Sequence, residues 1–402
     1  MARDVLNLDA QMRSASQSVP GRSLLAGVTV ECLSSPALLK ADWRVLERQS
    51  TLPFTGYAWA QAWYAGVAAR QDQQPVIVIG RDTRAEPLFI LPLVLENRGP
   101  FQVLLWPGGT HAAYHCGLFS KPCRALVKAA GPDAFWRHVF STVPRADALI
   151  AYGVPELDAE FDNPMRALPF TDTGCTSHRF TLMADWEAFY QAKCTAKLRR
   201  DERRCERRLA ELGDVAFKIA QTPEDKLALV DRMLDQKSIQ LCASGAPDFT
   251  AAPGVREFYR HLVTSPAWRG KAEVLLCALT IDGEPVAVTL ALIEKGCAFG
   301  LILSMTDGEA ARFGPGRQLL RRVIAHCCAR GLRSFDLGAG DDPSKLRWED
   351  EQVRRRDVLV PLSPKGWLLV SGMRAFFAVK GAIKTSPVLW RMFSRHRRYL
   401  GC

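Results

Sequence analysis

The sequence predicts an α/β protein in which two successive units each combine a mixed β-sheet with flanking helices. Three observations support this prediction. The chain has 402 residues, which exceeds the usual size of one domain. Strand-like and helix-like segments alternate along it, and their order in the C-terminal part repeats that of the N-terminal part. Hydrophobic residues make up 48% of the chain and charged residues 24%, as expected of packed globular cores.

We divide the chain into five predicted segments: a disordered N-terminus at 1–24, a first α/β domain at 25–185, a basic connecting helix at 186–213, a second α/β domain at 214–362 and a basic amphipathic tail at 363–402. The N-terminus lacks the apolar run of a secretory signal. No stretch reaches the about 18 apolar residues of a membrane span. We therefore expect a cytoplasmic protein.

The elements of the first unit follow from β-type runs and from helical spacing of apolar residues. A short strand begins at Val28, and helical patterns follow Pro36 and Pro53. The further elements are a hairpin over 75–95, a strand over 103–106, a helix over 125–139 and a strand over 148–151.

The second unit follows one charged helix predicted over 186–212. Its hairpin turns at Asp282-Gly283, the strongest short hairpin signal in the chain. Around it we expect helices over 227–239 and 258–263, hairpin strands over 273–281 and 285–293, a strand over 298–304, a helix over 317–330 and a strand over 334–337.

The segment with the clearest chemical meaning is Gly314-Pro315-Gly316, which links a predicted strand to a predicted helix. Glycine lets the backbone approach a ligand closely, and proline suits the first position of a helix. The free N–H groups of a first helical turn, together with the helix dipole, attract anions. The pattern indicates an anion-binding turn, although such a turn is also common as a plain loop.

Further short motifs occur in a fixed order from about Val28 to Leu362. They are Pro53-Phe54-Thr55-Gly56-Tyr57-Ala58-Trp59 with Trp63 after it, Lys197-Leu198-Arg199-Arg200 through Arg207-Arg208-Leu209 to Leu212-Gly213, Gly283-Glu284-Pro285-Val286-Ala287, Gly314-Pro315-Gly316, Gly331-Leu332 and Phe335-Asp336-Leu337-Gly338. With these motifs the chain resembles the CelD-like acetyltransferases, a branch of the GNAT superfamily that is associated with cellulose and exopolysaccharide synthesis and related to the FemABX peptidyltransferases.

This resemblance implies two tandem GNAT-like domains, with the acyl-carrier site in the C-terminal one. It implies transfer of an acyl group from acetyl-CoA or another acyl-CoA to a polar cell-envelope or exopolysaccharide intermediate, such as an amino sugar. The first domain lacks a turn of the Gly314 type, so we expect it to shape the acceptor groove. The residues expected to hold the carrier are Leu301, Leu303, Arg312, Gly314, Gly316 and Arg317.

For catalysis we single out Lys345 and Asp336. Similar proteins carry a Tyr-Lys pair after the last glycine turn, whereas this chain has Ser344-Lys345, so no role of that tyrosine is carried over. A base is needed to take a proton from the acceptor amine. The candidates are Asp336, Asp341, Asp342 and Glu349. Each could equally be a structural carboxylate.

Two basic blocks account for much of the net charge of +11. The stretch from Lys193 to Arg208 contains eight basic and three acidic residues. The stretch from Ser363 to Cys402 contains eight basic residues and no acidic residue. The first block suggests that Arg199 and Arg200, with Trp348, bind the acceptor, or else that a solvated helix pairs its own charges. Aromatic residues within the second block suggest contact with an anionic membrane, or else a packed helix.

Two other readings of the function stay open. One is a FemABX-like transfer of an aminoacyl group from charged tRNA, although the chain lacks a long coiled-coil insertion; apart from this case, nucleic acid is not expected as a partner. The other is a non-catalytic, membrane-peripheral scaffold with a vestigial acyl site. The 12 cysteines and 7 histidines are dispersed, so we expect free thiols and no metal site.

Overall fold

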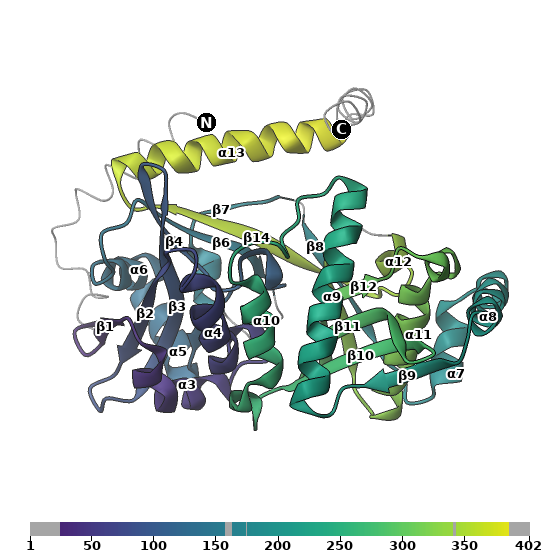
Figure 1. The fold of residues 1–402 in the computed structure, drawn as a ribbon. Coiled ribbons are helices and arrows are strands. Elements are labelled where there is room, and N and C mark those ends of the chain that lie inside the picture. Colours follow the sequence, from purple (N-terminus) through teal and green to yellow (C-terminus); the bar gives the residue numbers. More distant parts are fainter. Residues whose placement is uncertain (1–24, 157–162, 174, 341–342, 386–402) are drawn as a thin grey trace.

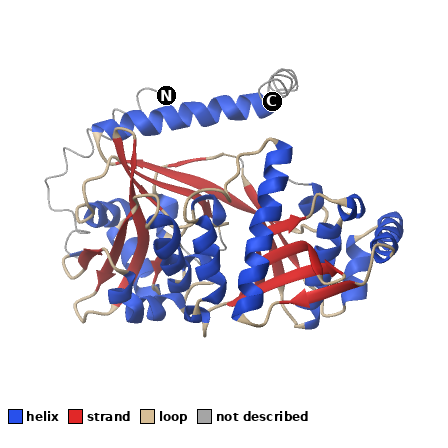
Figure 2. Ribbon diagram, viewed as in Figure 1, coloured by secondary structure: helices blue, strands red, loops and turns tan. Residues whose placement is uncertain are grey.

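The computed structural model describes residues 25–156, 163–173, 175–340 and 343–385. The predicted disordered N-terminus lies outside these residues, as does the end of the tail. Within them, 14 strands form one continuous sheet in the order β1-β2-β3-β4-β6-β14-β8-β13-β12-β11-β10-β9, with β5 and β7 at its sides. Helices pack along the strands of both halves of this sheet (Figures 1 and 2). The α/β fold with a large mixed sheet is therefore confirmed.

The first half contains the predicted hairpin as β2 and β3. Its elements are β1 (Thr29–Leu33), η1 (Pro36–Leu39), α3 (Lys40–Glu47), η2 (Pro53–Thr55), α4 (Tyr57–Trp63), η3 (Tyr64–Ala68), β2 (Gln74–Arg81), β3 (Pro87–Arg98), β4 (Phe101–Leu105), η4 (Gly109–His111), β5 (Leu118–Phe119), α5 (Lys121–Ala130), α6 (Pro132–Phe140), β6 (Ala148–Pro155), η5 (Pro164–Ala167) and β7 (Phe170–Thr171). The single helix predicted over 125–139 is wrong. Gly131 interrupts it with φ 83°, and Pro132 starts a new helix.

The second half also follows the predicted order. Its elements are β8 (Thr176–Thr181), α7 (Trp186–Lys193), α8 (Ala196–Ala210), β9 (Val215–Ile219), α9 (Pro223–Ser244), α10 (Val255–Thr264), η6 (Pro266–Trp268), β10 (Glu273–Ile281), β11 (Glu284–Glu294), β12 (Cys297–Met305), η7 (Glu309–Phe313), α11 (Pro315–Ala329), β13 (Ser334–Ala339), α12 (Pro343–Leu346), β14 (Glu351–Pro361) and α13 (Pro364–Thr385).

The charged helix predicted over 186–212 is two helices. Cys194 ends α7 in an extended conformation, with ψ 129°. The hydroxyl of Thr195 then accepts a hydrogen bond from the N–H of Leu198 and starts α8. By contrast, the predicted turn at Asp282-Gly283 is confirmed, because both residues have the positive φ, 49° and 87°, that a two-residue hairpin turn requires.

The two halves repeat one plan. In the first half β1 to β4 are followed by β6, and in the second half β9 to β12 are followed by β13. In each half, helices follow the first strand in the sequence and precede the second strand. These helices include α4 in the first half, and α9 and α10 in the second. Two strands, however, are exchanged: β8, which comes directly after the strands of the first half in the chain, pairs with β13, and β14, the last strand of the chain, returns to pair with β6. One sheet therefore runs through both halves.

One hydrophobic core joins the halves. It contains side chains of α4 in the first half and of α9 and α10 in the second, packed on the sheet. Phe54 of the first half meets Phe299 of β12 edge to face, with 5.8 Å between the ring centres. Separate cores lie under α5 and α6 and under α7, α8 and α11. The halves are therefore fixed against each other by shared packing.

Candidate functional site

Strands β12 and β13 diverge within the second half. They pair in parallel only where Cys297–Phe299 meet Ser334–Asp336, although β12 continues to Met305 and β13 to Ala339. Beyond Phe299 the two strands no longer pair with each other, and we call the region between their unpaired ends the slot. Ligands of open α/β sheets bind at such carboxyl ends of parallel strands.

Glycines line the start of this slot. A Cβ atom on Gly300 would lie 3.4 Å from the ring of Phe335 and 3.5 Å from the carbonyl oxygen of Asp336. Across the slot, Gly338 has φ 70°, and a Cβ atom there would lie 3.6 Å from the carbonyl oxygen of Gly300. Side chains at these positions would narrow the slot, whereas glycine leaves the backbone open to a thin ligand.

A β-bulge interrupts β12 beside the slot. In the pairing with β11, Leu290 lies opposite Ile302 and Ala291 lies opposite Gly300, so Leu301 has no partner. Consequently Leu301 and Ile302, although adjacent, both pack against the core that joins the halves. A bulged residue leaves the ladder locally unpaired, so its backbone groups can bind a ligand. This is the predicted position of the oxyanion donors around Leu301 to Ser304.

The Gly314 turn lies between the end of β12 and α11. Gly314 adopts φ 62° and ψ 55°, and its carbonyl accepts from the N–H groups of Arg317 and Gln318 at 3.1 and 3.2 Å. Pro315 has no N–H. The N–H of Gly316 has no acceptor among the described residues, and Gly316 itself is buried. The first turn of a 15-residue helix thus presents a donor and the positive end of its dipole.

Two arginines accompany the turn. Arg312 and Arg317 are both exposed, and neither makes an ion pair within the part of the chain that the structure describes. The guanidinium of Arg317 folds over the turn, since a Cβ atom on Gly314 would lie 2.7 Å from its Nη2. The structure therefore brings the predicted residues Arg312, Gly314 and Arg317 together at one helix N-terminus.

Leu303 and Gly316 are in contact beneath the turn. A Cβ atom on Gly316 would lie 3.8 Å from Leu303 and 3.5 Å from the sulfur of Met305. On the other side of β12, Lys237 of α9 donates to the carbonyl oxygen of Leu303 at 3.1 Å. Sequence reasoning missed Lys237. It lies near the end of the apolar stripe of α9, beside the buried Gln236, and nothing local links it to β12.

Asp336 is buried, 1% exposed, at the narrow end of the slot. It accepts hydrogen bonds from the hydroxyl of Tyr114 at 2.6 Å and from the N–H of Gly338 at 2.8 Å. Arg179 lies 3.5 Å from the same carboxylate. Burial, reinforced by the Asp336 charge, raises the pKa of Tyr114 well above its usual value, so this hydroxyl stays a donor. Because hydrogen bonds already occupy both carboxylate oxygens, Asp336 is better suited to position its neighbours than to act as the catalytic base.

Lys345 lies on α12, just beyond the end of β13. Its ammonium donates to the carbonyl oxygen of Ala339 at 2.5 Å. Asp341 and Asp342, two of the candidate bases, lie outside the described residues. The remaining candidate, Glu349, accepts from Nδ1 of the buried His178 and from Gln352. These bonds, that of His178 first, lower the pKa of Glu349.

The predicted acceptor residues are not brought together. Trp348 is 3% exposed and lies in an aromatic stack, 6.0 Å from Phe180 and 5.9 Å from Phe189 between ring centres. Its predicted contact with a substrate is therefore corrected to a packing role. Arg199 bonds the carbonyl groups of Gln191 and Cys194 at the end of α7. Of the three predicted acceptor residues, only Arg200 is exposed.

Most acidic residues of α8 do not pair with its own arginines. Glu202 and Glu206 face α11 instead, where Arg321 contacts both of them and Arg322 contacts Glu206 at 2.7 Å. Only Asp201 approaches Arg204 within α8, at 3.8 Å. The exposed Arg200, Arg203 and Arg207 therefore make no ion pairs within the described part of the chain. The side of α8 that packs beside α11 carries Glu202 and Glu206, and the three arginines lie on its exposed side.

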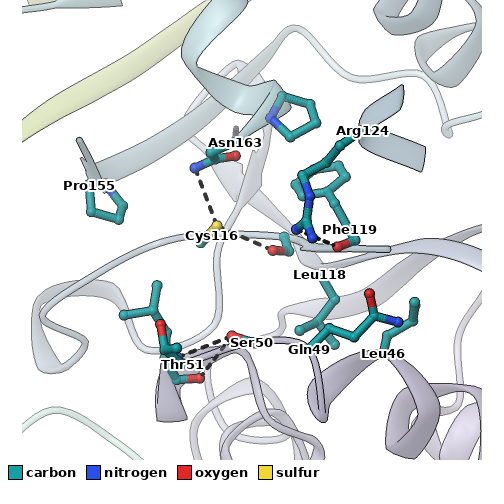
Figure 3. Close-up of a pocket in the computed structure, with 13 residues that line it drawn as sticks. Leu46, Gln49, Ser50, Thr51, Cys116, Leu118, Phe119, Arg124, Pro155 and Asn163 are labelled. Carbon is teal, nitrogen blue, oxygen red and sulfur yellow. Dashed lines mark hydrogen bonds between the residues drawn. The ribbon is translucent and has the colours of Figure 1, made fainter. Parts of the chain in front are cut away.

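A small pocket in the first half is separate from this site (Figure 3). It has a volume of about 40 Å³, which is room for little more than a water molecule. Arg124 donates to the carbonyl oxygen of Phe119 there, and Asn163 donates to the sulfur of Cys116. Burial raises the pKa of Cys116 to about 12, so its thiol is not a nucleophile at neutral pH. This pocket offers no catalytic group.

Comparison with known proteins identifies the domain around the site. The family described as acetyltransferase (GNAT) domain matches residues 196–346, which include the slot and the turn. No curated protein matches the chain. The chain therefore carries a GNAT acyltransferase domain, and the protein is an acyltransferase.

The chain is similar to several solved structures. FemX is 10% identical and has a TM-score of 0.53, over 85% of this chain and 100% of FemX. A conserved protein of unknown function from Bacteroides thetaiotaomicron is 10% identical with a TM-score of 0.50, over 83% of this chain and 100% of its own. The C-terminal domain of a putative lysylphosphatidylglycerol synthetase from Agrobacterium fabrum is 12% identical with a TM-score of 0.48, over 85% and 97%.

The described residues contain no group of three or more histidine, cysteine, aspartate or glutamate side chains placed to hold a metal ion. None of their helices is both long and apolar enough to cross a membrane.

Proposed function

We propose that the protein transfers an acyl group from acetyl-CoA, or another acyl-CoA, to an amine. The carrier would lie in the slot between β12 and β13, with its pyrophosphate at the Gly314 turn. The observation that carries this proposal is the junction of three features: diverging strands, glycines that leave the slot open, and a helix N-terminus with two unpaired arginines. A thin chain ending in phosphates fits both the slot and the turn.

The residues of the site suit this transfer. The acceptor nitrogen attacks the thioester carbonyl, the C–N bond forms, the C–S bond breaks, and the thiolate leaves. Backbone N–H groups at the Leu301 bulge would stabilise the oxyanion that develops on the carbonyl oxygen. Lys345 would supply positive charge near the end of β13, and the buried Asp336 would position that end through Gly338. The amine loses its proton to water or to a base that is not yet assigned.

Calorimetry with acetyl-CoA tests the carrier site. The double variant Arg312→Gln/Arg317→Gln should bind acetyl-CoA roughly tenfold or more weakly, since two charge-assisted contacts are lost. Arg84→Gln, an exposed arginine in the β2–β3 turn, is the matched control and should bind normally. If the parent protein does not bind acetyl-CoA, or the double variant binds it equally well, the proposal fails.

For the acceptor we propose an amino sugar or a related polar intermediate of the cell envelope, as in exopolysaccharide or cellulose synthesis. The support is the resemblance to the CelD-like acetyltransferases. We also propose that the protein is cytoplasmic and that α13 holds it at an anionic membrane. The exposed apolar side chains of α13 include Leu368, Phe376 and Val379. Release of free CoA thiol in the presence of glucosamine, absent with a non-amine sugar, would support this acceptor class.

A second candidate is aminoacyl transfer from charged tRNA, which the unpaired basic face of α8 favours. Arg200, Arg203 and Arg207 lie on the exposed side of α8, a helix that packs beside α11, and such a basic face could bind a polyanion. In this case Arg203→Gln/Arg207→Gln should weaken tRNA binding and reduce its salt dependence, while acetyl-CoA affinity is unchanged. If the protein turns over neither acetyl-CoA nor charged tRNA, the remaining interpretation is a non-catalytic scaffold.

A further inference from the structure

A second and larger pocket lies in the first half, at the place that corresponds to the transfer slot. Strands β4 and β6 pair in parallel only over Val103–Leu105 and Ala148–Ile150, as β12 and β13 do in the second half. The pocket opens beside the ends of this pairing and has a volume of about 260 Å³. That is just below the range of about 300–1,000 Å³ typical of ligand pockets, so one small ring would fill it.

Both halves of the protein build this pocket. The first half supplies its floor from β3, β4 and β6 and one side from η4. The segment before α10 adds Phe249, Ala252 and Val255 from the second half. Gln71 bridges the two, since its side-chain amide donates to the carbonyl oxygen of Pro253 at 2.9 Å. The pocket therefore depends on how the two halves pack together.

The lining combines apolar surface with polar side chains and carries no net charge. Glu96 and Arg98 neutralise each other, with Nε of Arg98 2.6 Å from the carboxylate. Burial lowers the pKa of His111 to about 4 and that of His115 to about 3, so both rings are neutral at pH 7. A charged ligand would find no opposite charge that is not already paired. An uncharged polar ligand suits this lining better.

Several groups that can hydrogen bond remain at the pocket surface. Nδ1 of His111 lies 2.9 Å from the hydroxyl of Tyr259, which leaves its Nε2 for a ligand. Thr110 is exposed, and the half-buried Tyr152 also lines the pocket. Trp63 and Phe249 add apolar aromatic surface. Hydroxyl and imidazole groups beside aromatic carbon suit a molecule with hydroxyl groups around a C–H face.

We propose that this pocket binds an uncharged, hydroxyl-bearing sugar ring of the acceptor. The inference rests on the proposed function for the direction of transfer, but sugar binding itself does not require it. The pocket also lies close to the transfer slot. Tyr114, whose hydroxyl bonds Asp336, follows His111 by three residues, a chain distance of at most about 11 Å. An acceptor longer than one ring can therefore reach from the pocket toward the slot.

Ligand-observed NMR and calorimetry with N-acetylglucosamine test this inference, with lysine and glycerol 3-phosphate as charged comparison probes. Thr110→Trp should fill the pocket, and His111→Phe should remove one hydrogen-bonding group. Thr83→Trp, in the exposed β2–β3 turn, is the control. We expect N-acetylglucosamine to bind the parent and the control, and to bind both pocket variants roughly tenfold more weakly or not at all.

The inference is overturned if N-acetylglucosamine does not bind the parent at millimolar concentration, or binds the pocket variants as well as it binds the parent. Preference for either charged probe would overturn it too. Acetyl-CoA affinity, measured on the same proteins, separates the two proposals. If the protein binds acetyl-CoA but not the sugar, only the pocket proposal is wrong. If it binds the sugar but not acetyl-CoA, only the proposed acyl transfer is wrong.

Discussion

Lys345 provides the positive charge nearest to the end of β13 among the predicted site residues. If this charge acts on the acceptor or on the developing oxyanion, Lys345→Met should lower kcat/KM by one to three powers of ten, each worth about 1.4 kcal/mol. The loss of its bond to Ala339 should cost only about 1 kcal/mol of stability. Steady-state kinetics and thermal melting measure both effects. Lys128→Met, an exposed lysine of α5, is the control.

The opposite result would assign Lys345 a structural role. In that case kcat/KM on the true acceptor stays normal and only the melting temperature falls.

His111 and His115 should make the fold sensitive to acid. Their folded pKa values, about 4 and about 3, lie below the unfolded value of about 6.5. Between these values the unfolded chain binds more protons, so the free energy of unfolding decreases as the pH falls below about 6.5. Each histidine should remove about 1–2 kcal/mol at pH 5. Urea unfolding at pH 7 and pH 5 measures this loss, and His111→Phe should show a smaller one than the parent.

The prediction of the carrier residues rests on local chain signals, which the other site residues lack. Gly314, Arg312 and Arg317 lie within six residues of one another, and a glycine before a helix is visible in the sequence. Tyr114 and Lys237 reach the site from distant segments, so no local pattern could indicate them. Trp348 shows the converse: its aromatic ring suggested a ligand contact, but burial within the stack on Phe180 decides its role.

At the scale of elements, α13 presents two different faces. Val370 is 2% exposed against the core, whereas Leu368, Phe376 and Val379 are 65%, 62% and 58% exposed. The described part of this helix has no acidic residue. An exposed apolar face beside basic residues is typical of helices that lie in an anionic membrane interface. Figure 1 shows α13 lying along one edge of the molecule, where its outer face is accessible.

Replacement of the outer face tests this role of α13. The variant Leu368→Gln/Phe376→Gln/Val379→Gln should keep its fold, because these side chains are exposed, but should no longer sediment with anionic vesicles at low salt. Leu38→Gln changes a 71% exposed leucine elsewhere and is the control. Equal sedimentation of the triple variant and the parent, or no sedimentation of the parent, would contradict membrane contact through this helix.

Elements with strong local signals were predicted well. The Asp282-Gly283 hairpin and the long helix α11 required only turn chemistry and helical periodicity. The two helix predictions that were wrong contained a break with a local cause, Gly131-Pro132 in one and Thr195 in the other. In both cases apolar periodicity continued across the break and concealed it.

At the scale of the whole molecule, a buried ion pair helps to hold the halves together. Lys271 lies 3.2 Å from Glu294, and the two side chains are 3% and 2% exposed. The ammonium also donates to the carbonyl groups of Glu47 and Ser50 in the first half. Lys271→Met should lower the free energy of unfolding by about 3–5 kcal/mol, because Glu294 is left buried without its partner.

A double-mutant cycle separates the pair from the packing around it. Lys271→Met/Glu294→Gln should recover part of that loss, since no unpaired charge remains. Arg330→Met, which breaks the exposed pair with Glu273, should cost less than about 1 kcal/mol. Similar losses for Lys271→Met and Arg330→Met in chemical denaturation would show that the buried pair does not hold the halves together.

The repeated plan of the two halves could be predicted from the order of elements, but the exchange of β8 and β14 could not. β8 has 6 residues and β14 has 11, but the partners of both strands lie far away in the chain. Pairing over such distances depends on which sheet edge is left open after the other strands have packed. The resulting continuous sheet places the first half beside the transfer slot, where it contributes Tyr114.

The central claim is that the Gly314 turn binds the phosphates of an acyl carrier. Gly314→Ala tests it most directly, because its Cβ atom would meet the guanidinium of Arg317 at 2.7 Å in a left-handed conformation. Gly331→Ala is the matched control at the other end of α11. Its φ of 67° imposes similar backbone strain, of about 1–2 kcal/mol, but no atom lies within 4 Å of the added Cβ.

Calorimetric titration with acetyl-CoA is the measurement. The two variants should lose similar stability, but Gly314→Ala should bind acetyl-CoA roughly tenfold or more weakly while Gly331→Ala binds it like the parent. Equal affinity of Gly314→Ala and Gly331→Ala for acetyl-CoA would contradict the assignment of the carrier site.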